Sequence, residues 1–109
     1  MSAVPVASDA VLARRAAAGD RAALDALFAA HRAVAYRVAH RLLGNEADAL
    51  DAVQEGFVNA LRNLDRFAGR SSFRTWLLRV VTNAALDAGR GRRRRDARAA
   101  GPLPADDPA

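Results

Sequence analysis

The sequence predicts an all-α fold, a compact bundle of three long helices and one short N-terminal helix. Apolar residues recur at three- and four-residue steps, and no stretch alternates apolar and polar residues as a half-buried strand does. Hydrophobic residues make up 51% of the chain, with Ala frequent and aromatics only 6%, which favours closely packed helices over a sheet. A length of 109 residues suits one domain.

Capping residues set the expected helix boundaries. Ser, Asp and Asn side chains accept hydrogen bonds from the first free N–H groups of a helix, and Gly commonly follows its last turn. Residues 1–8 have no such pattern and are expected to be a flexible tail. The predicted helices cover about residues 9–18, 21–43, 46–64 and 73–90, and the expected caps and stops are Ser8, Asp9, Gly19, Asp20, Gly44, Asn45 and Ser72.

Each long helix has a predicted inner face. Gly91 and the repulsion among neighbouring arginines are expected to fray the last helix. The residues predicted to face inward are Leu24, Leu27, Phe28, Val34, Val38 and Leu42 in the second helix, Val53, Phe57, Ala60, Leu61 and Leu64 in the third, and Phe73, Trp76, Leu77, Val80, Val81 and Ala84 in the fourth.

The positive charge is concentrated in one segment. The whole chain carries a net charge of +5, and residues 65–95 hold nine Arg against two Asp, whereas residues 1–64 are neutral overall. A localised basic block of this kind predicts a polyanionic partner. The absence of Lys among the 17 basic residues has a simpler interpretation, the codon bias of a GC-rich genome.

Several classes of protein are disfavoured by the sequence. The lack of Cys excludes disulfides, thiolate metal sites and Cys nucleophiles. No phosphate-binding or nucleophile motif occurs, and His31 and His40 would lie on opposite sides of one helix. We therefore predict no enzyme activity, no catalytic residue, no cofactor and no metal site. Without a signal peptide or an apolar run of about 20 residues, no membrane insertion and a cytoplasmic location are expected.

An acidic face is predicted on the third helix. Asp48, Asp51 and Glu55 are three and four residues apart, so they share one face, with Gln54 beside them. This face could dock a basic partner helix, or it could simply be solvated. A metal site is the weakest interpretation, because no His follows at a ligand spacing.

The break before the fourth helix has the chemistry needed to capture an unstacked base. Hydroxyl and backbone N–H groups can read a base edge, aromatic rings can stack on it, and Arg can hold the flanking phosphates. The alternative is a plain helix–helix turn, and for Phe73 and Trp76 a role in the core is favoured. The predicted DNA-binding residues of the break are Phe67, Arg70, Ser71, Ser72 and Arg74.

The outer face of the fourth helix extends this basic surface. Arg79, Asn83 and Arg90 follow helical spacing, and Arg and Asn suit bidentate contacts with bases or phosphates. The arginines of residues 90–95 can add phosphate contacts that carry no sequence information. We predict that these side chains bind DNA.

Two motifs, in this order along the chain, resemble a known family. Residues 48–57 read D-A-L-D-A-V-Q-E-G-F, similar to region 2.2 of bacterial sigma factors, with Leu50 in place of an acid and Gly56 in place of an apolar residue. Residues 67–83 resemble regions 2.3 and 2.4 of extracytoplasmic-function members, and the resemblance extends over about residues 9–95. The matching positions of the second motif are Phe67, Gly69, Ser71, Phe73, Trp76, Leu77, Val80, Val81 and Asn83.

The resemblance implies a sigma region 2 type fold and a role in transcription initiation. In that family the region 2.2 helix binds the clamp coiled coil in the β′ subunit of core RNA polymerase, and regions 2.3 and 2.4 recognise and melt the −10 promoter element. An anti-sigma factor is a further partner that the family often has. By resemblance, the polymerase contacts would come from Asp48, Asp51, Gln54 and Glu55.

The domain organisation follows from the same resemblance. Residues 9–95 would form the region 2 domain, and residues 96–109, acidic and Pro-rich, resemble the interdomain linker. That linker would lie in the RNA channel of the polymerase or act as a plain spacer. We expect the region 4 domain, which reads the −35 element, to be absent from this chain, as in a fragment.

Two other classes remain open from the sequence. One is a basic helical module that binds DNA without RNA polymerase. The other is a bundle that only binds proteins through its acidic helix. Dependence on polymerase separates the first from the sigma interpretation, and binding to nucleic acid separates the second.

Overall fold

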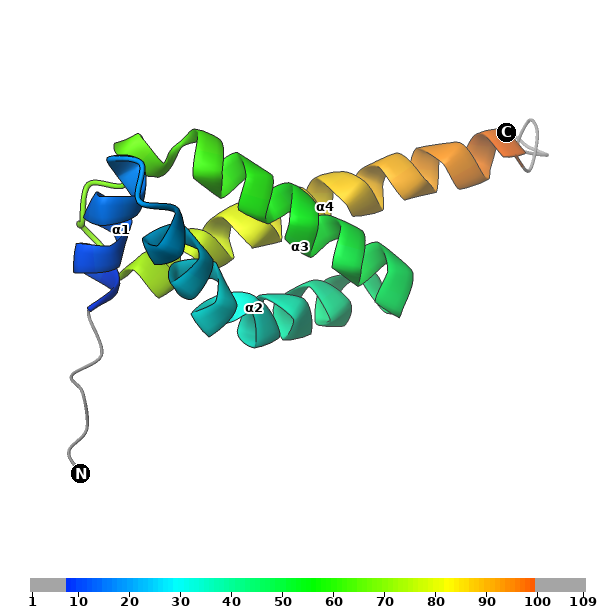
Figure 1. Ribbon diagram of the computed structural model, residues 1–109. Helices are drawn as coiled ribbons and strands as arrows, with labels where there is room; N and C mark the ends of the chain where they lie inside the picture. Colours follow the sequence, from blue (N-terminus) through cyan, green and yellow to red (C-terminus); the bar gives the residue numbers. More distant parts are fainter. Residues whose placement is uncertain (1–7, 100–109) are drawn as a thin grey trace, which may run out of the picture.

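The computed structural model describes residues 8–99, and its helices are α1 (Asp9–Ala17), α2 (Arg21–Leu43), α3 (Glu46–Arg62) and α4 (Phe73–Ala99), with a short 3-10 turn η1 (Leu64–Arg66) before α4. Helices α2, α3 and α4 pack into a bundle with α1 at one end, and α4 protrudes from the other end (Figure 1). Within residues 8–99 all regular structure is helical, which confirms the predicted fold class. Most of the predicted tail and linker lies outside the described residues.

The predicted N-terminal caps are confirmed at four helices, while Asp9, the alternative to Ser8, is the first residue of α1 and not its cap. The side-chain oxygens of Ser8, Asp20, Asn45 and Ser72 each accept a hydrogen bond from the backbone N–H three residues later, at 3.2, 3.1, 2.9 and 3.0 Å. Gly44 ends α2 in the left-handed conformation, with φ of 81°. Each of these interactions is local, so residue type alone was sufficient to place it.

The ends of the last two long helices differ from the prediction. Helix α3 ends at Arg62 and gives way to η1. Helix α4 continues through Gly91 to Ala99, so the expected fraying at Gly91 is wrong, and the first four residues assigned to the linker are helical. Arg92 pairs with Asp96 one turn later at 3.9 Å and with Asp48 of α3 at 2.9 Å, which offsets the repulsion among its neighbours.

The buried line of α2 runs through smaller residues than predicted. Leu27 is buried, but Leu42 is 45% exposed, so its assignment to the core is wrong. The buried residues of α2 recur at four-residue steps. The alanines among them let neighbouring helices approach closely, and the larger apolar residues flank this line. The buried residues of α2 are Ala23, Leu27, His31, Ala35 and Ala39.

The inner faces of α3 and α4 largely match the prediction. Every predicted inner residue of α4 is buried or half-buried. In α3, Leu61 is 47% exposed and its prediction is wrong, because Ala60 occupies the inner position and the next residue is turned about 100° around the helix. The other four predicted residues of that face, Val53, Phe57, Ala60 and Leu64, are buried.

Two ion pairs attach α1 to α2. Arg15 Nη2 lies 2.8 Å from Asp20 Oδ2, and His31 Nε2 lies 2.8 Å from Asp9 Oδ2. The backbone N–H of Ala23 and the guanidinium of Arg15 hold the pKa of Asp20 below its ordinary value. Both ends of α1 are therefore fixed to α2.

Helices α3 and α4 come into close contact at Gly56. A Cβ atom at this position would lie 2.9 Å from the Cα and 2.9 Å from the Cγ2 of Val81. Both residues are buried. The glycine costs about 1 kcal/mol of helix propensity relative to Ala, but it makes the close crossing possible.

The variant Gly56→Ala is expected to destabilise the protein. Overpacking of this kind costs ~1–3 kcal/mol, more than the ~1 kcal/mol gained in helix propensity. The measurement is the free energy of unfolding from urea denaturation.

Gly89→Ala is the matched control for this variant. It also replaces a helical glycine, but its Cβ would meet Leu43 Cδ2 at an ordinary 3.5 Å, so we expect it to stabilise the protein. An equal gain in stability from both substitutions would contradict the proposed crowding at Gly56.

Candidate protein and nucleic-acid interfaces

The acidic face of α3 is present, but its members are not equivalent. Asp51, Gln54 and Glu55 are exposed on successive turns of the helix. Asp48 is half-buried and engaged within the protein. Three of the four predicted polymerase-binding side chains are thus accessible to a partner.

Asp48 joins the start of α3 to the protruding part of α4. Its backbone N–H donates to Asn45 Oδ1, and its Oδ2 accepts from Asn45 Nδ2 and from Arg92 Nη1, each at 2.9 Å. The Asp48 carboxylate therefore already has hydrogen-bond donors within the protein, the Asn45 amide and the Arg92 guanidinium. The sequence motif could not reveal this contact, because Arg92 lies 44 residues further along the chain.

An apolar groove of about 810 Å³ lies beside the acidic residues, between α2 and α3. Leu50 and Leu61 of α3 line it and are 51% and 47% exposed, and Gln54 is at its edge. From α2, the Arg32 guanidinium lies 5.9 Å from the centre of the Phe57 ring. Exposed large apolar side chains next to carboxylates are typical of a protein-binding surface. The sequence had placed Leu61 in the core and so missed this groove.

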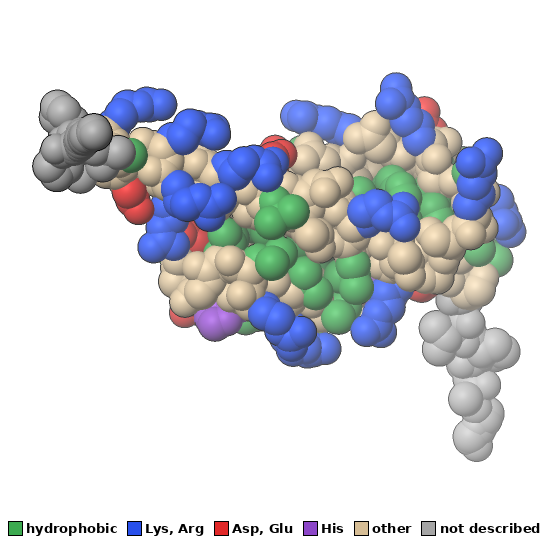
Figure 2. All heavy atoms as spheres, turned by 180° about the vertical axis from the view of Figure 1, so that it is seen from behind, with side chains coloured by type: hydrophobic (Ala, Val, Ile, Leu, Met, Phe, Trp, Pro, Cys, Tyr) green, Lys and Arg blue, Asp and Glu red, His purple; other side chains and the backbone are tan. Residues whose placement is uncertain are grey.

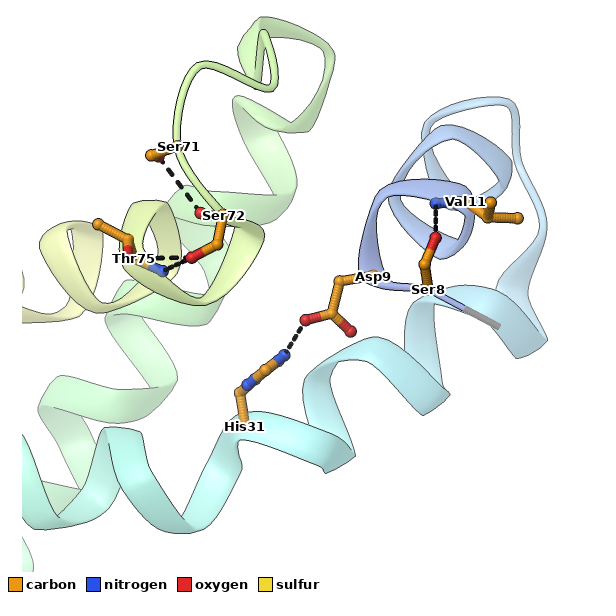
Figure 3. A network of polar contacts seen from close by, with 7 residues as sticks. All are labelled: Ser8, Asp9, Val11, His31, Ser71, Ser72 and Thr75. Atoms are coloured by element: carbon orange, nitrogen blue, oxygen red, sulfur yellow. Dashed lines mark hydrogen bonds and ion pairs between the residues drawn. The ribbon is translucent and has the colours of Figure 1, made fainter. Parts of the chain in front are cut away.

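The loop between η1 and α4 exposes the predicted basic side chains. Arg70 and Arg74 are exposed, and within residues 8–99 they form no ion pair. The Ser72 hydroxyl accepts from the Thr75 N–H and donates to Thr75 Oγ1 at 2.9 Å, while the Ser71 hydroxyl donates to the Ser72 carbonyl at 3.2 Å (Figure 3). Ser72 is thus a helix cap first, and Ser71 is the freer hydroxyl.

Aromatic rings surround the two ends of this loop. Phe73 is 2% exposed, which agrees with its predicted role in the core. Trp76 is half-buried, and its ring centre lies 5.7 Å from that of Phe73. Phe67 is half-buried, meets Phe73 edge to face at 5.6 Å and lies 5.4 Å from Trp76. The loop is therefore fixed at both ends by one aromatic cluster, Phe67, Phe73 and Trp76.

A second cavity, of about 420 Å³, lies between α1 and the loop. Its walls are mostly apolar, with Arg14 and Asp65 as the charged residues among them. Phe67 and Gly69 line it from the loop side. Helix α1 consequently forms part of the surroundings of the loop.

The outer face of α4 continues the basic surface away from the loop. Arg79 and Asn83 are exposed, whereas Arg90 forms an ion pair with Asp87 one turn earlier. Arginine side chains project from the protruding end of the helix (Figure 2). From Phe73 to Arg90 this line is about 25 Å long at 1.5 Å per residue, so the predicted DNA-binding residues form a track, not a single pocket.

Among residues 8–99, His31 is the one charged or polar residue that is buried, at 8% exposure. Besides its contact with Asp9, its ring centre lies 5.7 Å from that of Phe73 (Figure 3 shows the contact with Asp9). The sequence predicted neither the burial of His31 nor its contact with Asp9. His31 stands in a four-residue series with Leu27 and Ala35, and this spacing is the signal that could have predicted its burial.

The same residues, 8–99, contain no group of three or more His, Cys, Asp or Glu side chains that could hold a metal ion. None of the described helices is both long enough and apolar enough to cross a bilayer.

Residues 27–95 match the family model described as Sigma-70 region 2. The chain is 50% identical over 56 residues to the ECF RNA polymerase sigma factor SigG of Mycobacterium tuberculosis, which covers 51% of this chain and 15% of that protein. It is 36% identical over 69 residues to SigW of Bacillus subtilis, covering 63% and 37%, and 39% identical over 80 residues to SigM of M. tuberculosis, covering 73% and 41%.

The chain therefore belongs to the sigma-70 region 2 family, as a region 2 domain of the extracytoplasmic-function type. It spans less than half the length of each of these three relatives. Helix α1 precedes the residues that the family model matches.

The Arg92–Asp48 contact generates a testable prediction. Arg92→Ala should speed amide hydrogen exchange in residues 90–98, because the protruding helix loses its link to α3, although a half-exposed pair contributes only ~0.2–1 kcal/mol. Arg94→Ala removes the same charge from an exposed position and is the control. Equal acceleration in the two variants would show that the ion pair does not hold the helix.

Proposed function

We propose that this chain is the part of a transcription initiation factor that binds core RNA polymerase through α3 and opens −10 promoter DNA with the loop at residues 67–72 and with α4. The observation that supports this most is the presence of two chemically opposite surfaces on one small bundle. An acidic and apolar surface lies on α3, and a basic loop and helix track lies on α4. A factor that bridges a protein and a nucleic acid needs both.

The polymerase-binding part of the proposal assigns the partner to the clamp coiled coil of the β′ subunit. Membership in the family and the printed names of the relatives, RNA polymerase sigma factors, support a polymerase partner. Asp51, Gln54 and Glu55 would make the polar contacts, and Leu50 would add apolar contact from the adjoining groove. Asp48 would contribute mainly by orienting α3 and α4.

The DNA-binding part of the proposal is capture of an unpaired base at the loop. Extruding a base costs a few kcal/mol, and stacking on an aromatic side chain returns ~1–3 kcal/mol. Phe67 is half-buried beside the loop, with part of its side chain open to solvent. Ser71 can hydrogen-bond a base edge, and Arg70 and Arg74 can hold the flanking phosphates. Arg79 and Asn83 would then contact the upstream edge of the opened region, and Arg90 and the arginines after it would contact phosphates.

The proposed function is binding without catalysis, so it needs no cofactor, and it belongs in the cytoplasm with the polymerase. An anti-sigma factor would inhibit it by covering the α3 surface. A second candidate is a DNA-binding module that works without polymerase, which the arginine-rich end of α4 favours. Binding to core polymerase separates the two.

Reversal of charge on α3 tests the polymerase contact. Asp51→Arg with Glu55→Arg should abolish capture of the chain by core RNA polymerase, because like charges would then face a basic partner, while helicity by circular dichroism is unchanged. Glu46→Arg changes an exposed acid at the start of the same helix and should still be captured. Full retention by the double variant would rule out docking through this face.

Substitution in the loop tests base capture. Arg70→Ala with Ser71→Ala should weaken binding to single-stranded −10 DNA more than binding to duplex DNA, since only the single strand offers an extruded base. Fluorescence anisotropy measures both affinities. Arg94→Ala should weaken both by a similar factor, as expected for a phosphate contact. An equal loss on both DNAs from the loop variant would point to a general phosphate role.

A further inference from the structure

Helix α1 faces the loop across a shared cavity, although it lies outside the residues matched by the family model. It packs against α2, η1 and α4, and its residues Ala13 and Arg14 line the cavity whose other wall includes Phe67. The N-terminal end of α1 is held by the contact between Asp9 and His31. Helix α1 is thus connected both to the bundle and to one wall of the cavity beside the loop.

The Asp9–His31 pair touches the aromatic cluster directly. His31 Nε2 lies 2.8 Å from Asp9 Oδ2, and the imidazole centre lies 5.7 Å from the Phe73 ring at an angle of 44°. His31 is buried and Asp9 sits in the first turn of α1, where a carboxylate is favoured by the helix dipole. The carboxylate fixes the plane of the imidazole, and the imidazole forms one side of the site in which Phe73 packs.

Phe73 transmits this constraint to the loop. It is the first residue of α4 and is almost fully buried, and its ring meets Phe67 edge to face at 5.6 Å and Trp76 at 5.7 Å. Phe67 is the first residue of the loop at residues 67–72, and Phe73 follows its last residue. A shift of the Phe73 ring would therefore move both ends of the loop.

We propose that Asp9 and His31 are positioning residues for base capture, and that α1 is a working part of the DNA-binding site through them. This inference rests on the proposed function of the loop. The pair does not touch the nucleic acid. It holds Phe73, and through Phe73 it holds Phe67 and the loop in the arrangement that accepts an unstacked base.

The test is the variant Asp9→Ala in the full 109-residue chain. Trp76 is the single tryptophan of the chain and belongs to the aromatic cluster, so its fluorescence quenching by acrylamide reports the packing at the loop. The DNA probe is a single-stranded oligonucleotide selected from a random pool for binding to the wild-type chain. Asp9→Ala should increase Trp76 quenching and weaken this binding about tenfold, the scale of one lost base-stacking contact.

Two matched variants define the outcome. Arg15→Ala removes the other ion pair between α1 and α2 without touching the cluster, and it should leave quenching and DNA affinity near wild type. Asp9→Asn keeps an oxygen that accepts a hydrogen bond from the imidazole, and it should restore both readouts. Circular dichroism and capture by core polymerase should be unchanged in all three variants.

Two results would overturn the inference: unchanged Trp76 quenching in Asp9→Ala, or equal effects of Asp9→Ala and Arg15→Ala on quenching and affinity. Absence of single-stranded DNA binding by the wild-type chain would instead refute the proposed function of the loop. In that case the quenching comparison still decides whether the pair positions the loop.

Discussion

The distance between α3 and α4 is set where Gly56 meets Val81, with no room for a side chain between them. The exposed carboxylates and the apolar groove belong to α3, and the basic track belongs to α4. The close crossing therefore fixes how the two surfaces lie relative to each other. Asp48 and Arg92 add a second, polar link between the same two helices beyond the crossing. In the proposed function, this rigidity would hold the protein-binding surface and the DNA-binding surface in a fixed relation.

The sequence was sufficient for features that depend on neighbouring residues. The caps at Asp20 and Asn45 were predictable because donor and acceptor are three residues apart. The acidic face and the basic loop were predictable because each lies within one short segment. Exposure of Leu61 beside buried Ala60 was not, because only the distance to the neighbouring helices decides which of two adjacent apolar residues faces inward.

Contacts between distant segments account for what the sequence missed in the candidate site. The same motif that marked Asp48 as a partner-binding residue gave no sign of Arg92. The predicted inner face of α2 did not include His31, and nothing in the sequence linked it to Asp9, 22 residues earlier. The glycine at position 56 looked like a departure that weakens a helix. In the fold, the crossing of α3 and α4 requires a glycine at this position. A residue that lowers helix propensity can therefore be the one that allows two helices to pack closely.

The uninterrupted course of α4 from Phe73 to Ala99 has a geometric consequence. A continuous helix does not change its length, so Phe73 at its start and the arginines near residue 90 stay about 25 Å apart. At about 3.4 Å per base pair this corresponds to roughly seven base pairs of DNA. In the proposed binding mode, the helix would keep a fixed distance between two sets of DNA contacts. The protein would then be sensitive to spacing along the DNA as well as to the identity of the bases.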